Sequence, residues 1–275
     1  MSEKLKNIFG KRENIIIGAI HFPPLPGYPD FPGLNIALEN ALADLKSFET
    51  GGVDAIIVEN NYDTPHKTFV DPEVADALEC LSKKVKEVTH LPVGISVLWN
   101  DYKTALKISQ KLGLKFIRVP VFVDKVETNY GIMEPKADEI IAFQKEIGAE
   151  NVALFTDIHV KHSKILSPYS IVESARMAIE KGSDAIIITG KWTGDAPNLE
   201  ELKKVKRIVE DFPIMIGSGV DDINVKKLFE YANGAIISTS LKEGDVKENE
   251  INLKSWQQRI SKAKVRYLVN TLNQV

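Results

Sequence analysis

Three ionisable side chains stand at alternate positions of one short segment: Asp157, His159 and Lys161. The first half of this segment, 155–162, reads as a buried β-strand, and successive side chains of a strand point to opposite faces. The spacing therefore predicts that the acid, the imidazole and the amine share one face. Burying three ionisable groups is costly unless they pair or meet water or a ligand. We interpret the segment as a strand that ends at a functional pocket, with a purely structural ion-pair network as the alternative.

These residue types suit acid–base chemistry near neutral pH. His159 has the pKa range of a general acid or base, and Asp157 could orient it, act as a base itself or ligate a cation. Lys161 could neutralise an anionic substrate or form a Schiff base. Glu59, Asp157 and a histidine could together hold a divalent metal, and the sequence indicates no other cofactor.

The remaining histidines give weaker signals. His159 and His162 should fall on opposite faces while the strand persists, so the sequence argues against a chelating pair. We interpret His66 and His90 as solvated loop residues, because no other candidate residue accompanies them.

The elements that would position these residues form a regular series. Each of eight apolar runs is followed by a helical pattern, and the runs show little alternation, which is typical of parallel strands covered on both faces. The segments that connect a helix to the next strand are short, while several of the segments that connect a strand to the next helix are long. This arrangement predicts an α/β fold with one (β/α)8 TIM barrel domain over 1–275, a lead at 1–14 and helices at 251–275. The predicted strands are 15–22, 54–60, 92–99, 116–120, the first half of 155–162, 184–190, 213–217 and 234–238.

Polar residues stand at the ends of the first six predicted strands, where a TIM barrel builds its active site. We predict that two of them join the 155–162 segment in catalysis, namely His21 and Glu59. The others are predicted to bind substrate: Asn60, Asn100, Asp101, Arg118 and Thr189.

The last two strands end in small residues instead. Small side chains let backbone N–H groups approach an oxyanion, and a short helix after the last strand would add its positive end. Barrels often bind phosphate at this place, so we predict a phosphate site, with tight glycine turns as the alternative. Its residues are Gly217, Ser218, Gly219, Ser238, Thr239 and Ser240.

Composition excludes several functional classes. The 275 residues carry a formal net charge of −3, so no basic footprint for nucleic acid is present. A single cysteine, Cys80, suits a reducing cytoplasm, and no stretch reaches the ~18 apolar residues of a membrane span. Tyr28 and Phe31, in a proline-rich loop, could close over a ligand or pack against a second subunit of a homo-oligomer.

Seven segments, which span nearly the whole chain in order, match a known family: 18–27, 51–60, 97–101, 157–162, 189–194, 217–220 and 238–242. They resemble the BtpA/SgcQ family, a branch of the ribulose-phosphate-binding barrel superfamily. The resemblance implies a TIM barrel with a sugar-phosphate-type anion site. The family is named for a role in photosystem I biogenesis, and other members sit beside sugar-uptake genes.

The chain departs from the family pattern at two places. Asn61 and Tyr62 follow Asn60 where Phe-Gly is expected, which alters the loop beside the predicted site. Ser238 stands where the family usually has glycine, so the phosphate cradle should be tighter or use the hydroxyl group.

Three functions remain open at this point. The first is an enzyme acting on a small phosphorylated sugar or nucleoside-like ligand by isomerisation, lyase chemistry or hydrolysis. The second is a non-catalytic assembly factor, in which changing Asp157 or His159 would alter partner binding. The third is a barrel that senses a ligand without turnover.

Overall fold

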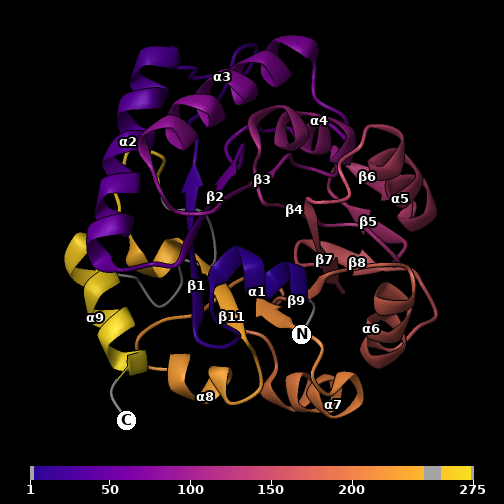
Figure 1. The fold of residues 1–275 in the computed structure, drawn as a ribbon. Helices are drawn as coiled ribbons and strands as arrows, with labels where there is room; N and C mark the ends of the chain where they lie inside the picture. Colours follow the sequence, from indigo (N-terminus) through magenta and orange to yellow (C-terminus); the bar gives the residue numbers. More distant parts are fainter. Residues whose placement is uncertain (1–2, 245–254, 274–275) are drawn as a thin grey trace.

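The computed structural model describes residues 3–244 and 255–273. Among them, eight parallel strands close into a barrel in the order β1-β11-β10-β9-β7-β4-β3-β2, with helices outside it (Figure 1). This confirms the predicted TIM barrel. The barrel strands are β1 (Ile15–His21), β2 (Ala55–Glu59), β3 (Val93–Ser96), β4 (Phe116–Val119), β7 (Ala153–Ile158), β9 (Ala185–Ile188), β10 (Ile214–Ile216) and β11 (Gly234–Ile237). The covering helices are α2 (Leu34–Gly51), α3 (Pro72–Val88), α4 (Tyr102–Leu112), α5 (Ala137–Glu146), α6 (Ile171–Glu180), α7 (Leu199–Val209) and α8 (Val225–Phe229).

The strands are apolar on both faces because both faces are buried. Ile17, Ile57 and Ile187 pack with one another inside the barrel. Their neighbours Ile16 and Ile56 belong to a second cluster between the strands and the helices. Burial on both sides is the physical reason for the missing polar alternation.

The N-terminal lead contains a helix that covers one end of the barrel. In α1 (Glu3–Phe9), Leu5 is 1% exposed and packs with the interior cluster. The ring of Phe9 lies 6.0 Å from that of Phe116 and 6.2 Å from that of Phe155. Figure 1 shows α1 lying across the barrel. The helix therefore shields the interior at the end where the strands begin.

A short sequence repeat has a structural cause. The motif Asp-Ala-Ile-Ile occurs at the start of both β2 and β9. Asp54 accepts a hydrogen bond from Ile16 N–H at 2.7 Å, and Asp184 accepts one from Leu154 N–H at 2.9 Å. Each aspartate thus satisfies a backbone donor of the neighbouring strand. The requirements of a buried parallel strand account for the repeat.

A small antiparallel sheet stands beside the barrel mouth. It consists of β5 (Val126–Thr128), β6 (Gly131–Met133) and β8 (Ser163–Ile165), in the order β6-β5-β8. The sequence predicted only long links out of several strands, so this sheet was missed. Strands of three residues are too short to show a period, and β8 arrives from a distant part of the chain.

The strand that carries Asp157 ends sooner than the alternating pattern predicted. β7 stops at Ile158, and His159 (φ 49°) and His162 (φ 59°) adopt the left-handed conformation, which is uncommon for residues other than glycine. His159 N–H donates to Asp124 Oδ2, and His162 N–H donates to the carbonyl of Lys191, each at 3.0 Å. These bonds hold a turn, so the predicted common face for Asp157, His159 and Lys161 is wrong beyond Ile158.

The C-terminal part carries α9 (Lys262–Asn273), which packs against α2 (Figure 1). Residues 251–254 and 274–275 of the predicted helical extension lie outside the described residues. After β11 the chain forms one 3-10 turn, η1 (Thr239–Leu241), where a short helix was predicted. A single turn supplies little helix dipole to an anion.

Candidate active site

A cavity of about 890 Å³ opens at the end of the barrel where the strands finish. This is the face on which TIM barrels place their active sites. Ten of the predicted site residues line it: His21, Glu59, Arg118, Lys161, Gly217, Ser218, Gly219, Ser238, Thr239 and Ser240.

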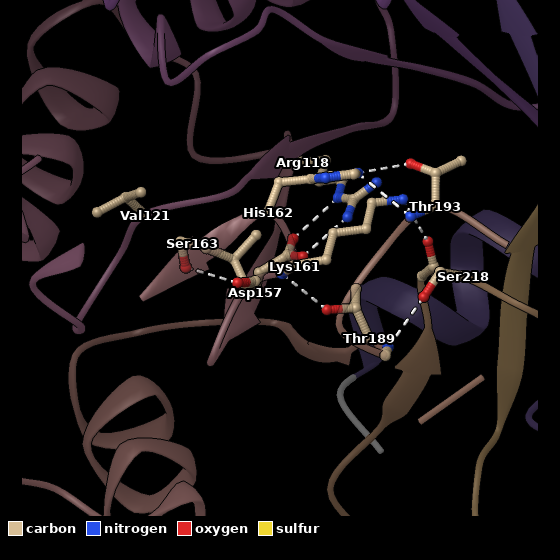
Figure 2. A network of polar contacts seen from close by, with 12 residues as sticks. Arg118, Val121, Asp157, Lys161, His162, Ser163, Thr189, Thr193 and Ser218 are labelled. Carbon is tan, nitrogen blue, oxygen red and sulfur yellow. Dashed lines mark hydrogen bonds and ion pairs between the residues drawn. The ribbon is translucent and has the colours of Figure 1, made fainter. Parts of the chain in front are cut away.

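Arg118 on β4 organises the floor of this cavity. Its Nε and Nη2 each donate to the carboxylate of Asp157 at 2.8 Å, and its Nη1 lies 3.6 Å from Glu59 Oε1. All three side chains are buried, and Asp157 does not line the cavity. Two parallel hydrogen bonds hold a guanidinium firmly in one orientation (Figure 2). Asp157 therefore positions Arg118.

His21 and Glu59 form a second contact on the floor. Asn61 Nδ2 donates to His21 Nδ1 at 3.2 Å, which leaves the proton of a neutral ring on Nε2, 3.5 Å from Glu59 Oε2. Burial, and then the charge of Lys242, lower the pKa of His21 well below its usual value. Burial raises the pKa of Glu59, against the opposing charge of Arg118. A carboxyl group with a raised pKa is suited to taking and returning a proton near neutral pH.

Lys161 reaches the cavity because the turn after β7 directs it there. Its backbone N–H donates to Thr189 Oγ1 at 3.0 Å, and its Nζ donates to the carbonyl of Gly217 at 3.4 Å. Figure 2 shows the amine beside Arg118. Burial, and then the charge of Arg118, lower the pKa of Lys161 to about 8. The ion pairs of the described residues include none between Lys161 and a carboxylate at 4 Å or less, so its charge remains available to an anionic ligand.

The wall formed by the ends of β10 and β11 carries the predicted phosphate residues. A Cβ atom at Gly217 would lie 2.6 Å from Ile187 Cγ2 and 3.2 Å from Arg118 Nη2, so glycine leaves room for the guanidinium. Gly219 has φ 68°, and a Cβ there would meet the backbone of Ala196 at 2.1 Å. These glycines are therefore required by the packing of the wall itself.

The three serines of this wall differ in their hydrogen bonding. Ser218 Oγ accepts from Gly190 N–H and donates to the carbonyl of Asp195, while Ser240 Oγ donates to the carbonyl of Val220. Ser238 Oγ is buried and has no hydrogen-bond partner among the described residues. Ser238 is thus the one of these three serines whose hydroxyl group has no hydrogen-bond partner in the described chain.

Four residues predicted to bind substrate do not line the cavity. Asn60 bonds both the N–H and the carbonyl of Leu98, and Asn100 does the same for Val121. Asp101 caps α4 by accepting from Thr104 N–H at 2.9 Å. These three and Thr189, whose hydroxyl holds the Lys161 turn, join loops to one another. The sequence placed them at the correct strand ends without showing which way they point.

His159 is also absent from the cavity lining. Its Nε2 is buried without a hydrogen-bond partner in the described part of the chain. The acid–base role predicted for this histidine has no support from its position, because the left-handed turn removes it from the face of Lys161.

The predicted metal site of Glu59 and Asp157 does not fit the observed geometry. The guanidinium of Arg118 contacts both carboxylates and supplies the positive charge there. Within 3–244 and 255–273, no group of three or more His, Cys, Asp or Glu side chains is placed to hold a metal ion.

Sequence reasoning missed several ring side chains of the cavity. His66 was predicted to be solvated, yet it lines the cavity together with Trp99, Tyr130 and His162. These residues come from four different loops. Aromatic residues in long strand-to-helix loops were the signal that could have found them.

Comparison with known proteins agrees with the fold and the motifs. The model of the BtpA family matches residues 12–265. The chain belongs to the BtpA family. It is 38% identical over 239 residues to the photosystem I biogenesis protein BtpA of Synechocystis sp., covering 86% of this chain and 83% of that protein. It is also 38% identical to an uncharacterised protein of Pyrococcus furiosus, over 86% of this chain and 90% of the relative.

Solved structures share the fold at low sequence identity. One is the (S)-3-O-geranylgeranylglyceryl phosphate synthase of Thermoplasma acidophilum in complex with sn-glycerol-1-phosphate, with a TM-score of 0.58, 13% identity and coverage of 99% and 98% of the two chains. Another is the N-(5'-phosphoribosyl)anthranilate isomerase of Pyrococcus furiosus, with a TM-score of 0.55, 13% identity and coverage of 95% and 100%. At such identity the likeness establishes the barrel fold alone. None of the helices in the described ranges is long and apolar enough to cross a membrane.

Proposed function

We propose that this BtpA-family member is an enzyme that performs acid–base chemistry on a small phosphorylated substrate. The observation that carries the proposal is the buried group of Glu59, Arg118 and Lys161 on the floor of a cavity. The wall of this cavity includes Ser238, whose hydroxyl group has no hydrogen-bond partner among the described residues. A fold gains nothing from a buried amine that forms no ion pair, whereas a site for an anionic substrate needs one.

In this proposal, different residues bind the substrate and transfer the proton. The wall at β10 and β11 holds the phosphate through Ser238 and backbone N–H groups. Lys161, whose Nζ reaches the carbonyl of Gly217 in that wall, adds its positive charge to the anion site. Arg118 stabilises negative charge that develops on the substrate. Glu59, whose pKa is raised by burial, removes a proton and returns one. His21 Nε2 lies 3.5 Å from Glu59 Oε2 and helps to orient the carboxylate.

Two observations from other proteins support the phosphorylated substrate class. Among the barrel structures that resemble this chain, one holds its substrate sn-glycerol-1-phosphate and another is an isomerase of a phosphoribosyl compound. The name of the Synechocystis relative favours the alternative, a non-catalytic biogenesis factor. That alternative does not explain the buried ionisable floor.

An incubation with a soluble metabolite extract tests the proposal. The extract is treated with the wild-type protein, with Glu59→Gln or with His90→Gln, and mass spectrometry follows its composition. His90 is exposed in a loop and serves as the control. We expect a phosphorylated compound to be converted by the wild type and the control, and at least 100-fold more slowly by Glu59→Gln. If the wild type changes no compound in the extract, the enzyme proposal fails.

A further inference from the structure

Five ring side chains gather at the cavity mouth and have no part in the chemistry proposed above. We call them the aromatic rim: His66, Trp99, Tyr130, His162 and Trp192. The rings of His66 and Tyr130 are 5.3 Å apart and nearly perpendicular, and those of His162 and Trp192 are 5.5 Å apart. Four of the five line the cavity, and Trp192 packs against His162.

Two residues of the aromatic rim, Trp99 and Tyr130, come from the side of the barrel opposite the proposed phosphate wall, while His162 and Trp192 follow β7 and β9 between the two sides. In the closed barrel, β3 and β4 lie opposite β10 and β11. Trp99 follows β3, and Tyr130 lies in the β5–β6 hairpin that follows β4. A ligand whose phosphate contacts the wall would therefore extend over the reactive floor toward these rings.

The two histidines of the rim are uncharged at neutral pH. Thr193 N–H donates to His162 Nε2 at 3.2 Å, so that nitrogen acts as an acceptor and carries no proton. Burial is the main cause that lowers the pKa of both His66 and His162 to about 4. Nδ1 of His66 is buried without a hydrogen-bond partner in the described chain. The rim is thus unsuited to a second anion, whereas its uncharged rings suit a flat, uncharged group.

We propose that the aromatic rim binds a planar heteroaromatic group, so that the ligand is a nucleoside monophosphate or a closely similar compound. This inference rests on the proposed function and names the substrate class of the same site. Flat rings stack on aromatic side chains. A pentose phosphate alone would leave the rim facing water. A cavity of about 890 Å³ has the size typical of sites for larger small molecules.

Calorimetric titration with matched ligands tests this inference. Ribose 5-phosphate, UMP, AMP and a disaccharide phosphate are titrated into the full-length wild-type protein and two variants. Tyr130→Ala removes a ring of the rim, while Tyr169→Ala removes a tyrosine of similar exposure (41% against 38%) that does not line the cavity. Because both side chains are partly exposed, both variants should fold, and circular dichroism verifies this.

We expect at least one nucleoside monophosphate to bind the wild type about tenfold or more tightly than ribose 5-phosphate, as expected for one stacked base. Tyr130→Ala should lose most of this difference and keep its affinity for ribose 5-phosphate. Tyr169→Ala should match the wild type.

Three results would overturn the inference while the proposed function stands. Ribose 5-phosphate could bind as tightly as both nucleotides, the disaccharide phosphate could bind best, or Tyr130→Ala could weaken all ligands equally. If none of the four phosphorylated compounds binds, the phosphate site fails as well, and the proposed function falls with it.

Discussion

At the scale of single residues, the site depends on how charge is shared around Arg118. This guanidinium binds Asp157 through two hydrogen bonds and contacts Glu59. Lys161 then has no carboxylate within ion-pair distance among the described residues, and burial lowers its pKa to about 8. In this arrangement Asp157 has a structural role, because it holds Arg118, and the charge of Lys161 is available to a ligand.

Replacing Lys161 with methionine tests directly whether the charge of Lys161 binds the ligand. We expect the affinity for ribose 5-phosphate at pH 7 to fall about tenfold or more, since a charge-assisted hydrogen bond contributes about 1.5–3 kcal/mol. In the wild type, affinity should decline as pH rises through about 8, because the amine then loses its proton. The phosphate itself ionises near pH 6, so it does not obscure this window. Calorimetry from pH 7 to 9 would contradict the account if variant and wild type showed the same profile.

Replacing Asp157 with asparagine should destabilise the fold. Removing one partner of a buried ion pair typically costs about 3–5 kcal/mol, because the other charge is left buried and unpaired. We expect urea denaturation to show a loss of this size. Asp138→Asn is the matched control, because Asp138 pairs with Lys181 while its side chain is 81% exposed. The control should lose less than about 1 kcal/mol, and equal losses in the two variants would refute the structural role.

At the scale of elements, the loops that follow the strands are joined by polar side chains. Asn60, Asn100 and Asp101 all bond backbone groups of neighbouring loops, and none lines the cavity. The sequence predicted these residues at strand ends correctly, because apolar runs locate the strands. It could not give the direction of their side chains, since direction depends on bonds between segments that are far apart in the chain.

In the 155–162 segment, too, the sequence did not give the direction of the side chains. Period-two alternation predicted a common face for Asp157, His159 and Lys161. Two left-handed residues after β7 end that alternation, and the bonds that hold them come from Asp124 and Lys191. Neither the turn nor the small antiparallel sheet beside it has a local sequence signal.

The variant Asp101→Ala tests whether Asp101 has the structural role seen here or the ligand-binding role predicted from the sequence. Its carboxylate caps α4 at Thr104 N–H and also accepts from Val70 N–H at 3.0 Å. Loss of such a cap costs about 0.5–2 kcal/mol. We expect chemical denaturation to show a decrease in this range, with affinity for ribose 5-phosphate unchanged within about twofold. A large loss of affinity in a stably folded variant would return Asp101 to the ligand site.

At the scale of the whole molecule, the barrel is covered differently at its two ends. The strand starts are covered by α1, whose Leu5 and Phe9 pack with the interior rings. The strand ends open into the cavity. The sequence predicted the barrel from its eight apolar runs, but it gave no indication that the lead is part of the barrel core.

Leu5→Ala tests whether α1 stabilises the barrel. Truncating a buried leucine typically costs about 2–5 kcal/mol, and Leu5 is 1% exposed. Lys6→Ala on the same helix is exposed and should change the free energy of unfolding by less than about 0.5 kcal/mol. If both variants unfold at the same urea concentration as the wild type, α1 contributes nothing to the fold.

The most direct test of the central claim, a phosphate held at the β10–β11 wall, is a calorimetric comparison of ribose 5-phosphate with ribose. We expect the wild type to bind the phosphorylated sugar at least 100-fold more tightly than ribose. Ser238→Asp places a negative charge where Ser238 Oγ has no partner within 3–244 and 255–273, and it should abolish this preference. Equal binding of the two sugars by the wild type, or full affinity for ribose 5-phosphate in Ser238→Asp, would contradict the account.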